Sequence, residues 1–359
     1  MITRAQIELA LTRAWMRRGP LACALLPFSW LYAAGHAVHG GLYRSGLLRS
    51  WRIGLPVVVV GNLYAGGTGK TPLVIELVRQ LKARGWRPGV ISRGYGRRTA
   101  DVRPVEAGAR ADEVGDEPLL IAQVGAVPVV VGADRVAAAR VLHSLNPKCD
   151  VIVCDDGLQH PRLARDVEIA VLHYRGIGNG WLLPAGPLRD PLERLKTVDA
   201  VVLNADVPPV RIHGQVFTMD TELDEVYAIA DPRHRAPLSV LVQEHRGKGT
   251  RIVAAAGIGA PERFFAMLRA AGLTIEAIPL PDHYDFAVNP FAGREFDVAL
   301  ITEKDAVKCR AIAALKTEGR LCAVSQRIRI EPALIDLIEA KIRPQSDRAE
   351  HDTNGPSPA

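Results

Sequence analysis

Residues 55–72 decide the fold of this chain, and they read Leu-Pro-Val-Val-Val-Val-Gly-Asn-Leu-Tyr-Ala-Gly-Gly-Thr-Gly-Lys-Thr-Pro. An apolar run, a glycine-rich loop and a helical pattern follow one another, which is the order that a phosphate-binding P-loop requires. The glycines let several backbone N–H groups point at one phosphate, and the start of the helix adds a positive dipole end. We therefore predict that a nucleotide binds to Gly66, Gly67, Thr68, Gly69, Lys70 and Thr71.

Two residues of this loop have chemical roles of their own. We expect Lys70 to reach the β- and γ-phosphates and the hydroxyl of Thr71 to hold Mg²⁺. Tyr64 departs from the common pattern, because a glycine usually stands at that place. A glycine turn that binds nothing is the alternative interpretation, and the register of Gly69, Lys70 and Thr71 argues against it.

Strand and helix patterns alternate after this loop. Continuous β-branched runs between helical patterns are typical of a parallel sheet covered on both faces, with ligands at the carboxyl ends of its strands. We predict strands at Val57–Gly61, Gly89–Ser92, Val127–Val131, Val151–Cys154, Ile169–Leu172 and Ala200–Leu203, and helices at Pro72–Arg84, Asp116–Gln123 and Asp134–Leu145.

The pattern changes near Ile212. Short strands are predicted at Gln215–Thr218, Val226–Ile229 and Ser239–Val242, with an exposed turn within Val240–Arg251. A second α/β unit then follows, so the sequence predicts an α/β fold with two units. Its predicted strands are Ile252–Ala256, Ile275–Pro279, Val298–Ile301 and Cys322–Val324, and its predicted helices are Pro261–Ala271, Ala306–Leu315 and Pro332–Ile342.

Length and composition agree with this organisation. The 359 residues are enough for two cores, and a hydrophobic content of 48% excludes a disordered chain. The net charge of +6 comes from dispersed Lys and Arg without a nucleic-acid recognition pattern, so we expect an anionic membrane or a phosphorylated substrate as partner and no nucleic acid. The five cysteines form no CxxC pair, which argues against a disulfide framework or a zinc site.

The N-terminal run Gly19–Ala34 is apolar and has arginines on both sides. It is shorter than the roughly 20 residues that a bilayer span needs, and Pro20 and Pro27 interrupt it. His36 and His39 extend it into a more amphipathic helix. We predict a helix that lies in or dips into the cytoplasmic leaflet. A helix that packs on its own domain is the alternative.

A second motif is an apolar run that ends in Asp155 and Asp156. A strand that ends in a carboxylate is the Walker B pattern, which aims the carboxylate at the Mg²⁺ beside a P-loop. Adjacent side chains of a strand point to opposite faces unless the chain turns, and Gly157 permits a turn. Asp155 and Asp156 are therefore candidate metal ligands, and a simple turn is the alternative.

Two further motifs lie near the same edge of the sheet. Residues 91–98, Ile-Ser-Arg-Gly-Tyr-Gly-Arg-Arg, offer arginine forks for phosphate, and a solvated basic turn is the alternative. Asp116 and Glu117 open a predicted helix, where acidic residues are favourable without any further role.

Two motifs of the second unit also follow predicted strands. His283 stands between Asp282 and Tyr284, and a histidine beside a carboxylate is a candidate for proton transfer or charge stabilisation. Residues 302–308, Thr-Glu-Lys-Asp-Ala-Val-Lys, begin where the α/β rule places ligands. An incidental loop histidine and a helix cap with surface charges are the alternatives.

Together these motifs resemble the tetraacyldisaccharide 4′-kinases of lipid A biosynthesis. The resemblance covers nearly the whole chain, and it explains Tyr64 because the loop of this family lacks the earlier glycine. Leu158 stands where many members carry Phe, and we expect no consequence. The motifs that carry the resemblance are Gly61-Asn62, Ala65 to Pro72, Ser92 to Gly96, Gly115 to Pro118, Asp155 to Gln159, Pro184 to Arg189 and Thr302 to Asp305.

The resemblance implies a fold and a reaction. The fold is a P-loop NTPase-like parallel-sheet domain plus a second, smaller α/β/α domain with a β-stranded linker, and an N-terminal membrane-associating helix. We place the segments at 1–45 (membrane-associating), 46–210 (P-loop kinase), 211–343 (second domain) and 344–359 (disordered tail). The reaction uses ATP and Mg²⁺ to phosphorylate the 4′-hydroxyl of a tetraacyldisaccharide 1-phosphate, which gives lipid IVA and ADP. A monomer at the cytoplasmic face of the bacterial inner membrane is expected.

The resemblance also implies roles for single residues. Asp116 would accept or orient the proton of the 4′-hydroxyl, and His283 would tune its basicity, with Lys70 as the third catalytic residue. The other expected site residues are Thr71, Glu117, Asp155 and Asp156 around Mg²⁺, Arg93, Tyr95 and Arg97 on the substrate side, and Gln159 on phosphate or metal. Roles for His160, Arg189, Asp190 and Lys304 stay open.

Three other function classes compete with this interpretation. One is a P-loop kinase or ATPase that acts on a small metabolite, which the apolar N-terminal run and His283 disfavour. The second is a nucleotide-dependent switch or partner-binding protein, in which hydrolysis only times an interaction. The third is a membrane-tethered structural protein, which the assembled site disfavours. Whether ATP turnover needs an acylated disaccharide discriminates among them.

Overall fold

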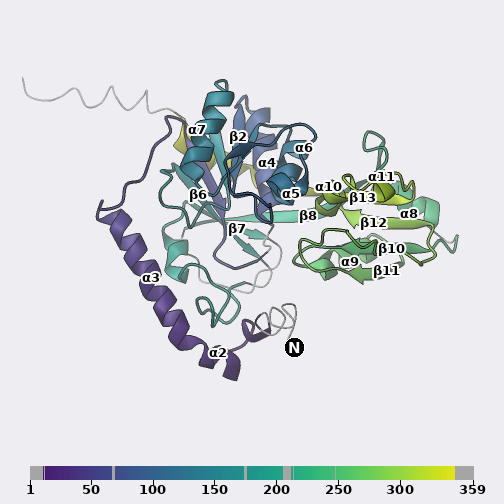
Figure 1. Ribbon diagram of the computed structural model, residues 1–359, viewed down its shortest axis with the longest axis horizontal. Coiled ribbons are helices and arrows are strands. Elements are labelled where there is room, and N and C mark those ends of the chain that lie inside the picture. Colours follow the sequence, from purple (N-terminus) through teal and green to yellow (C-terminus); the bar gives the residue numbers. More distant parts are fainter. Residues whose placement is uncertain are drawn as a thin grey trace, which may run out of the picture.

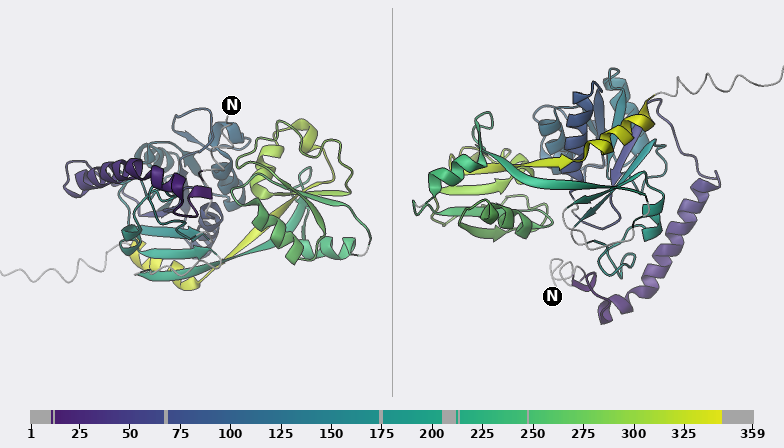
Figure 2. Two further views of the ribbon diagram at one scale, coloured as in Figure 1. Left: turned by 90° about the horizontal axis from the view of Figure 1, so that it is seen from below. Right: turned by 180° about the vertical axis from the view of Figure 1, so that it is seen from behind.

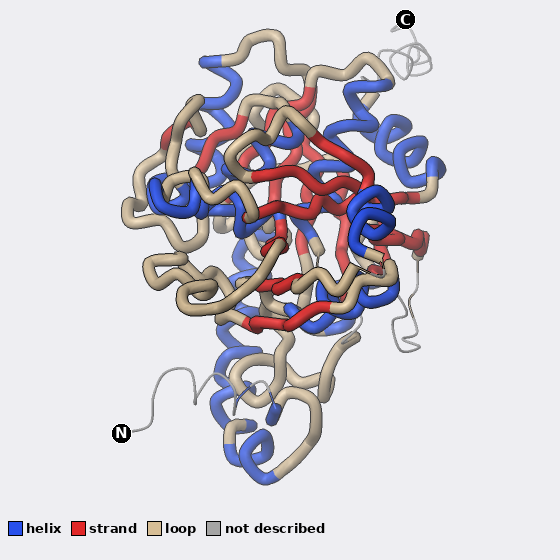
Figure 3. Tube along the Cα trace, turned by 90° about the vertical axis from the view of Figure 1, so that its right-hand side faces the viewer, coloured by secondary structure: helices blue, strands red, loops and turns tan. Residues whose placement is uncertain are grey.

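The structure is a computed structural model that describes residues 11–343 except 12, 67–68, 174–175, 205–211, 213 and 247. Two lobes share one continuous, mostly parallel sheet (Figure 1). Figure 3 shows the strands in the middle of the molecule with helices around them. The predicted α/β fold is confirmed at this level.

The larger lobe holds seven strands in the order β7-β6-β1-β5-β2-β4-β3, of which β3 is antiparallel to β4. These strands are β1 (Val57–Gly61), β2 (Pro88–Ser92), β3 (Arg103–Pro104), β4 (Val129–Val131), β5 (Val151–Asp155), β6 (Val167–His173) and β7 (Ala200–Asn204). Its helices are α4 (Lys70–Ala83), α5 (Ala111–Val114), α6 (Asp116–Gly125) and α7 (Arg135–Leu145), and a 3-10 helix, η1, spans Leu192–Lys196.

Strand β1 is buried on both faces, as its unbroken valine run predicts. Val58 and Val60 belong to the core that contains α4, whereas Val57 and Val59 belong to the core that contains α7. The glycine-rich loop therefore leaves the sheet from a rigid strand, and α4 begins at Lys70 directly after Gly69, whose φ is +85°.

The smaller lobe continues the sheet with three parallel strands in the order β11-β10-β12. These are β10 (Ile252–Ala256), β11 (Ile275–Pro279) and β12 (Val298–Thr302). Its helices are α8 (Leu238–His245), α9 (Pro261–Ala270), α10 (Glu303–Cys309) and α11 (Ala313–Lys316). Because parallel strands end at one edge of the sheet, the residues that follow β10, β11 and β12 lie close together.

Two long antiparallel strands join the lobes, β8 (Gln215–Ala228) and β13 (Leu321–Ile330). Figure 2 shows both running between the lobes. Strand β8 pairs with β7 at its start and with β9 (Arg235–Pro237) near its end, and β13 pairs with β12. The helix α12 (Pro332–Ile342) follows β13 and packs in the core of the larger lobe with α4.

The N-terminal helices α2 (Pro20–Ala24) and α3 (Leu26–Arg44) lie along one side of the larger lobe (Figure 1). Pro27 falls within the first turn of α3, so it marks a helix start and interrupts no helix. One side of α3 contacts the lobe: Ser29 Oγ donates to the carbonyl of Leu182 at 2.9 Å, and Tyr32 Oη donates to that of Arg189 at 2.8 Å. Within the described residues, every helix is too short or too polar to cross a bilayer.

Three secondary-structure predictions need correction. Ser239–Val242 is not a strand, because it lies in α8, where Leu238 and Leu241 are buried on one face. A short apolar run fits a strand or a helix equally well, and tertiary packing decides between them. The exposed turn accordingly begins only after His245.

The other two corrections concern element boundaries. The strands predicted at Gln215–Thr218 and Val226–Ile229 are parts of the single strand β8, since polar residues between them also pair with β13. The helix predicted at Ala306–Leu315 is two helices, α10 and α11, which are separated at residues 310–312.

Some predictions fall on residues that the structure does not describe. These are the phosphate-binding assignments of Gly67 and Thr68, the tail at 344–359 and the start of the N-terminal segment. The domain boundaries near 45, 210 and 343 stay predictions.

Candidate active site

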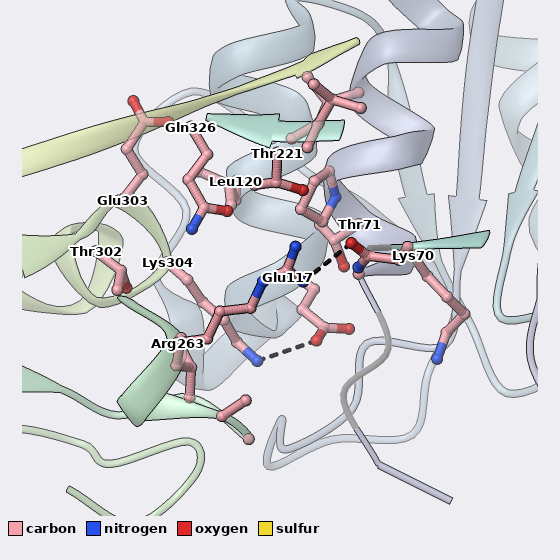
Figure 4. A pocket seen from close by; sticks show the side chains of 18 of the residues that line it. Lys70, Thr71, Glu117, Leu120, Thr221, Arg263, Thr302, Glu303, Lys304 and Gln326 are labelled. Carbon is pink, nitrogen blue, oxygen red and sulfur yellow. Dashed lines mark hydrogen bonds and ion pairs between the residues drawn. The ribbon is translucent and has the colours of Figure 1, made fainter. Parts of the chain in front are cut away.

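A large cavity lies between the two lobes. Its volume is about 1600 Å³, and its walls include the glycine-rich loop, α4, α9, α10 and the β8–β13 pair. In Figure 4, Lys70 and Thr71 lie on one side of the cavity, and Arg263 and Lys304 lie on the other. The site therefore requires both lobes.

The glycine-rich loop is held by Asn62, which follows β1 and is fully buried. The side-chain amide of Asn62 donates to the carbonyls of Tyr64 at 2.7 Å and Gly66 at 3.3 Å. Its Oδ1 accepts a hydrogen bond from Lys70 Nζ at 3.1 Å and another from Arg189. Asn62 therefore fixes the curvature of the loop and the direction of the Lys70 ammonium.

Asp156 has two cationic partners from the same lobe. Lys70 Nζ lies 3.4 Å from its Oδ1, and Arg189 donates to both carboxylate oxygens, at 2.9 and 3.2 Å. Burial by itself would raise the pKa of Asp156, but Lys70 and Arg189 outweigh burial and hold this pKa well below its usual range. The chain turns at Asp156 itself, where φ is +53°.

Asp155 ends β5 in a different environment. It is 1% exposed, and its Oδ2 accepts a hydrogen bond from Ser92 Oγ at 3.1 Å. Its Oδ1 is buried without a hydrogen-bond partner among the described residues. Burial and the nearby charge of Glu117 raise the pKa of Asp155 to about 7, although Lys70 acts in the opposite direction.

Asp116 and His283 meet across the two lobes. His283 Nδ1 lies 2.9 Å from Asp116 Oδ2, within hydrogen-bond distance, and Asp116 is 5% exposed. Burial alone would raise the pKa of Asp116, but the hydrogen bond from His283 and the charges of Lys304 and Lys308 lower it to about 2. Burial alone would lower the pKa of His283, but its hydrogen bond to Asp116 gives a net rise. The pair therefore favours a carboxylate beside an imidazolium.

Glycine geometry explains how Asp116 reaches this position. Gly115 has a φ of +93°, and a Cβ there would lie 3.0 Å from the carbonyl oxygen of Tyr95 and 3.1 Å from Cα of Gly94. The loop after β2 and the start of α6 therefore touch through glycine backbone, and a larger residue would separate them.

Lys304 extends from α10 into a group of three carboxylates. Its Nζ lies 3.0 Å from Glu117, 3.6 Å from Asp282 and 3.9 Å from Asp116. Burial by itself would lower the pKa of Lys304, but these carboxylates raise it. Lys304 thus stays charged and joins α10 to the first turn of α6 (Figure 4).

The residues predicted on the substrate side take different positions. Arg93 and Tyr95 line the cavity, and the ring of Tyr95 lies 5.1 Å from that of His283. Arg97 has a buried side chain 4.0 Å from Asp101, and it is not part of the described cavity wall. Gln159 also lies outside that wall and donates to the backbone carbonyl of Asn62 at 2.9 Å.

Two of the residues whose roles the sequence left open, His160 and Asp190, have defined contacts in the structure. His160 accepts a hydrogen bond from the backbone of Arg135, and burial together with Arg135 lowers the pKa of His160 to about 4. Asp190 is buried and lies 2.6 Å from His36 of α3. Gln159 donates to the second oxygen of Asp190.

The donor set fits a nucleotide-bound Mg²⁺ better than a protein-only metal site. Among the described residues, no three His, Cys, Asp or Glu side chains converge as a ready metal site. Mg²⁺ usually takes one or two carboxylates and completes its shell with phosphates and water. The orphaned Oδ1 of Asp155 and the hydroxyl of Thr71 beside Lys70 suit that partial role.

A glycine-rich loop between a strand and a helix that starts with Lys-Thr is typical of proteins that act on nucleotide phosphates. In this chain, the Asp116–His283 pair lies at the same cavity. The comparisons with known proteins name the family. The family model described as "Tetraacyldisaccharide-1-P 4'-kinase" (LpxK) matches residues 21–343, so the chain belongs to this family and is a kinase.

Individual relatives agree. A tetraacyldisaccharide 4′-kinase of Janthinobacterium sp. (strain Marseille) is 49% identical over 350 residues, which cover 96% of this chain and 99% of the relative. One of Herminiimonas arsenicoxydans is 47% identical over 352 residues, with 96% and 98% covered. A crystal structure of the "apo" form of LpxK from Aquifex aeolicus in complex with ATP superposes with a TM-score of 0.75 at 30% identity, with 90% of this chain and 99% of that chain covered.

Several residues of the site were not predicted to act there. Asn62 was noted only as part of a motif, and Arg263, which donates to Asn204 across the lobes at 2.9 Å, was not noted. Lys308 was treated as part of a helix start, although it is buried beside Asp116. A lysine on the apolar face of a predicted helix is the one signal that singles out Lys308.

Proposed function

We propose that this kinase transfers the γ-phosphoryl group of ATP to the 4′-hydroxyl of a tetraacyldisaccharide 1-phosphate. The observation that carries the proposal is the Asp116–His283 contact of 2.9 Å, made across the lobes at the cavity that contains Lys70 and Thr71. Membership of the 4′-kinase family supports the acceptor, and the ATP complex of the Aquifex aeolicus relative supports the donor.

Asp116 would receive the acceptor hydroxyl. A carboxylate whose pKa is about 2 is a weak base, so we infer that it mainly orients the hydroxyl and takes its proton as the P–O bond forms. This suffices, because phosphoryl transfer depends mostly on positioning and electrostatic stabilisation. His283 would fix the orientation of the Asp116 carboxylate and stabilise its negative charge.

The opposite wall would hold the nucleotide. Lys70 would leave Asn62 and Asp156 for the β- and γ-phosphates, and Thr71, Glu117, Asp155 and Asp156 are the candidate ligands for Mg²⁺. When bound, Mg²⁺ would neutralise charge on the phosphates. Arg93 and Tyr95, which line the cavity near His283, would face the sugar phosphate.

We further propose that α3 lies on the inner-membrane surface at its cytoplasmic face. The large apolar side chains of its outer side are exposed: Phe28 by 61%, Trp30 by 67%, Leu31 by 73% and Val38 by 63%. An exposed apolar surface of this kind, flanked by arginines, fits an interfacial helix. The site would then meet an acylated substrate that stays in the bilayer.

One assay tests the proposed reaction. Purified protein is incubated with ATP and Mg²⁺, with and without a detergent-dispersed tetraacyldisaccharide 1-phosphate, and the lipid is followed by mass. The proposal expects a lipid heavier by one phosphoryl group and ATP consumption that depends on the lipid. Lipid-independent hydrolysis with an unchanged lipid mass would refute it.

A further inference from the structure

Behind the Asp116–His283 pair lies a buried ion pair that the reaction described above does not use. Asp305 and Lys308 are both on α10, 0% and 8% exposed, and Lys308 Nζ lies 3.0 Å from Asp305 Oδ1. A buried ion pair contributes little net stability compared with apolar residues, so its presence calls for another reason. We propose that Lys308 and Asp305 are positioning residues that set the geometry of Asp116 and His283, an inference that rests on the proposed role of these two residues.

Lys308 acts on the Asp116 end. Its Nζ lies 3.7 Å from Asp116 Oδ2, which is the same oxygen that His283 contacts. Val307, the preceding residue, packs in one apolar cluster with Leu119 and Leu120 of α6. The docking of α10 on α6 therefore delivers a buried positive charge to Asp116.

Asp305 acts on the His283 end. Its Oδ2 accepts hydrogen bonds from the backbone N–H of Gly257 at 3.0 Å and from Thr302 Oγ1 at 2.7 Å. The carbonyl of Gly257 in turn accepts a hydrogen bond from the backbone N–H of His283 at 3.2 Å. One carboxylate thus supports His283 through Gly257 and Asp116 through Lys308.

The sheet explains why these residues meet. Gly257 directly follows β10, Asp305 lies in the first turn after β12, and His283 follows β11, so all three lie at the carboxyl ends of neighbouring parallel strands. A Cβ at Gly257 would lie 2.9 Å from Asp305 Oδ1 and 3.0 Å from Cβ of Tyr284. Asp305 therefore lies in close packing contact with the backbone that carries His283, which suits a residue that fixes a geometry.

The test separates positioning from stability with a double substitution. Lys308→Met leaves Asp305 buried and uncompensated, so it should lower both Tm and kcat. Lys308→Met/Asp305→Asn removes both charges, and we expect it to regain much of the lost Tm. We expect kcat of the double variant to stay about tenfold or more below wild type, with KM for ATP and for the lipid within about twofold.

Two further variants keep the test decisive. Lys316→Met makes the same chemical change at an exposed site on α11 and should leave Tm and kcat unchanged. Lys308→Arg keeps the charge, and we expect its kcat to lie within about threefold of wild type. If a folded Lys308→Arg enzyme has a kcat below about one tenth of wild type, the inference that the positive charge at residue 308 positions Asp116 is wrong.

The decisive outcome concerns the double variant. A double variant with recovered Tm and wild-type kcat, or with a raised KM at unchanged kcat, would overturn the positioning role. Asp116→Asn is measured in parallel: if it is inactive while the double variant is fully active, only the positioning inference fails. If Asp116→Asn itself turns over at the wild-type rate, the proposed reacting pair fails.

Discussion

Two deeply buried aspartates lie next to residues that line the cavity, Asp116 beside Glu117 and Asp155 beside Asp156, and they differ in how their charge is compensated. Asp116 has cations of the smaller lobe beside it, and its pKa is lowered to about 2. Asp155 has a hydroxyl from Ser92 and an oxygen without a hydrogen-bond partner among the described residues, and its pKa is raised to about 7. Cationic side chains thus compensate the charge of Asp116, whereas burial and the charge of Glu117 disfavour the charged form of Asp155.

The largest expected effect falls on the nucleotide side. Lys70→Ala removes the ammonium that Asn62 directs, so we expect kcat to fall by about 10³-fold or more. Far-ultraviolet circular dichroism should stay unchanged, because Lys70 is not one of the buried residues that pack α4 against the sheet. Turnover near the wild-type rate in this variant would refute the assignment of the loop.

The acceptor side should respond differently. Asp116→Asn and His283→Ala should each lower kcat by about 10²-fold or more while KM for ATP changes little, because the proposed nucleotide contacts lie on the opposite wall. Steady-state kinetics with both substrates varied provide the measurement. A rise in KM alone in either variant would assign that residue to binding.

A smaller effect is expected from α3, which lies outside both sides of the cavity. Phe28→Asp/Trp30→Asp should weaken sedimentation with anionic vesicles by about tenfold or more, since each buried aromatic side chain would contribute about 1.5 kcal/mol or more. Val288→Asp, at an exposed apolar residue of the smaller lobe, is the matched control. Equal vesicle binding by all three proteins would contradict the membrane proposal.

The smallest effect tests the two aspartates directly. The folded pKa of Asp155 is raised from 3.8 to about 7, so this group favours the folded state fully below pH 3.8, and that contribution is lost as pH rises from 3.8 to about 7. Without divalent cations, Tm should therefore fall between about pH 4 and pH 7 because of this group, and Asp155→Asn should reduce that slope.

Asp116 provides a contrast to Asp155. Its folded pKa is lowered from 3.8 to about 2, so its contribution is present above 3.8 and is lost only in more acidic solution. Between about pH 4 and pH 7, Asp116→Asn should therefore act on the slope only through His283, whose raised pKa depends on the hydrogen bond to Asp116. An equal slope in wild type and Asp155→Asn would contradict the assignment to Asp155.

The two sides also differ in how far the sequence predicts them. The strand β1, the loop and the start of α4 are consecutive in the chain, so periodicity and glycine content predicted them closely. The contacts of Asn62 with this loop span only a few residues, and they were within reach of the same argument. Arg97 was expected on the substrate side beside Tyr95, but side-chain burial against Asp101 depends on packing that no motif records.

Errors in the smaller lobe have the same origin. The short apolar run in α8 has no periodicity long enough to separate helix from strand, and its burial against the sheet decided the outcome. The single strand β8 was predicted in pieces, because its middle is polar and is stabilised by pairing with β13. In both segments, contacts with residues distant in sequence determine the secondary structure.

By itself, the sequence determined the parallel α/β layers and the glycine-rich connection from β1 to α4, because the residues that form each of them are neighbours in the chain. The resemblance implied that Asp116 and His283 act together, but only the tertiary structure showed their contact across 167 residues. It also showed that Lys308 and Lys304 approach the same carboxylate. The physical reason is the order of strands in the sheet. That order brings the ends of β10, β11 and β12 to one edge and docks α10 against α6, and neither relation is local in sequence.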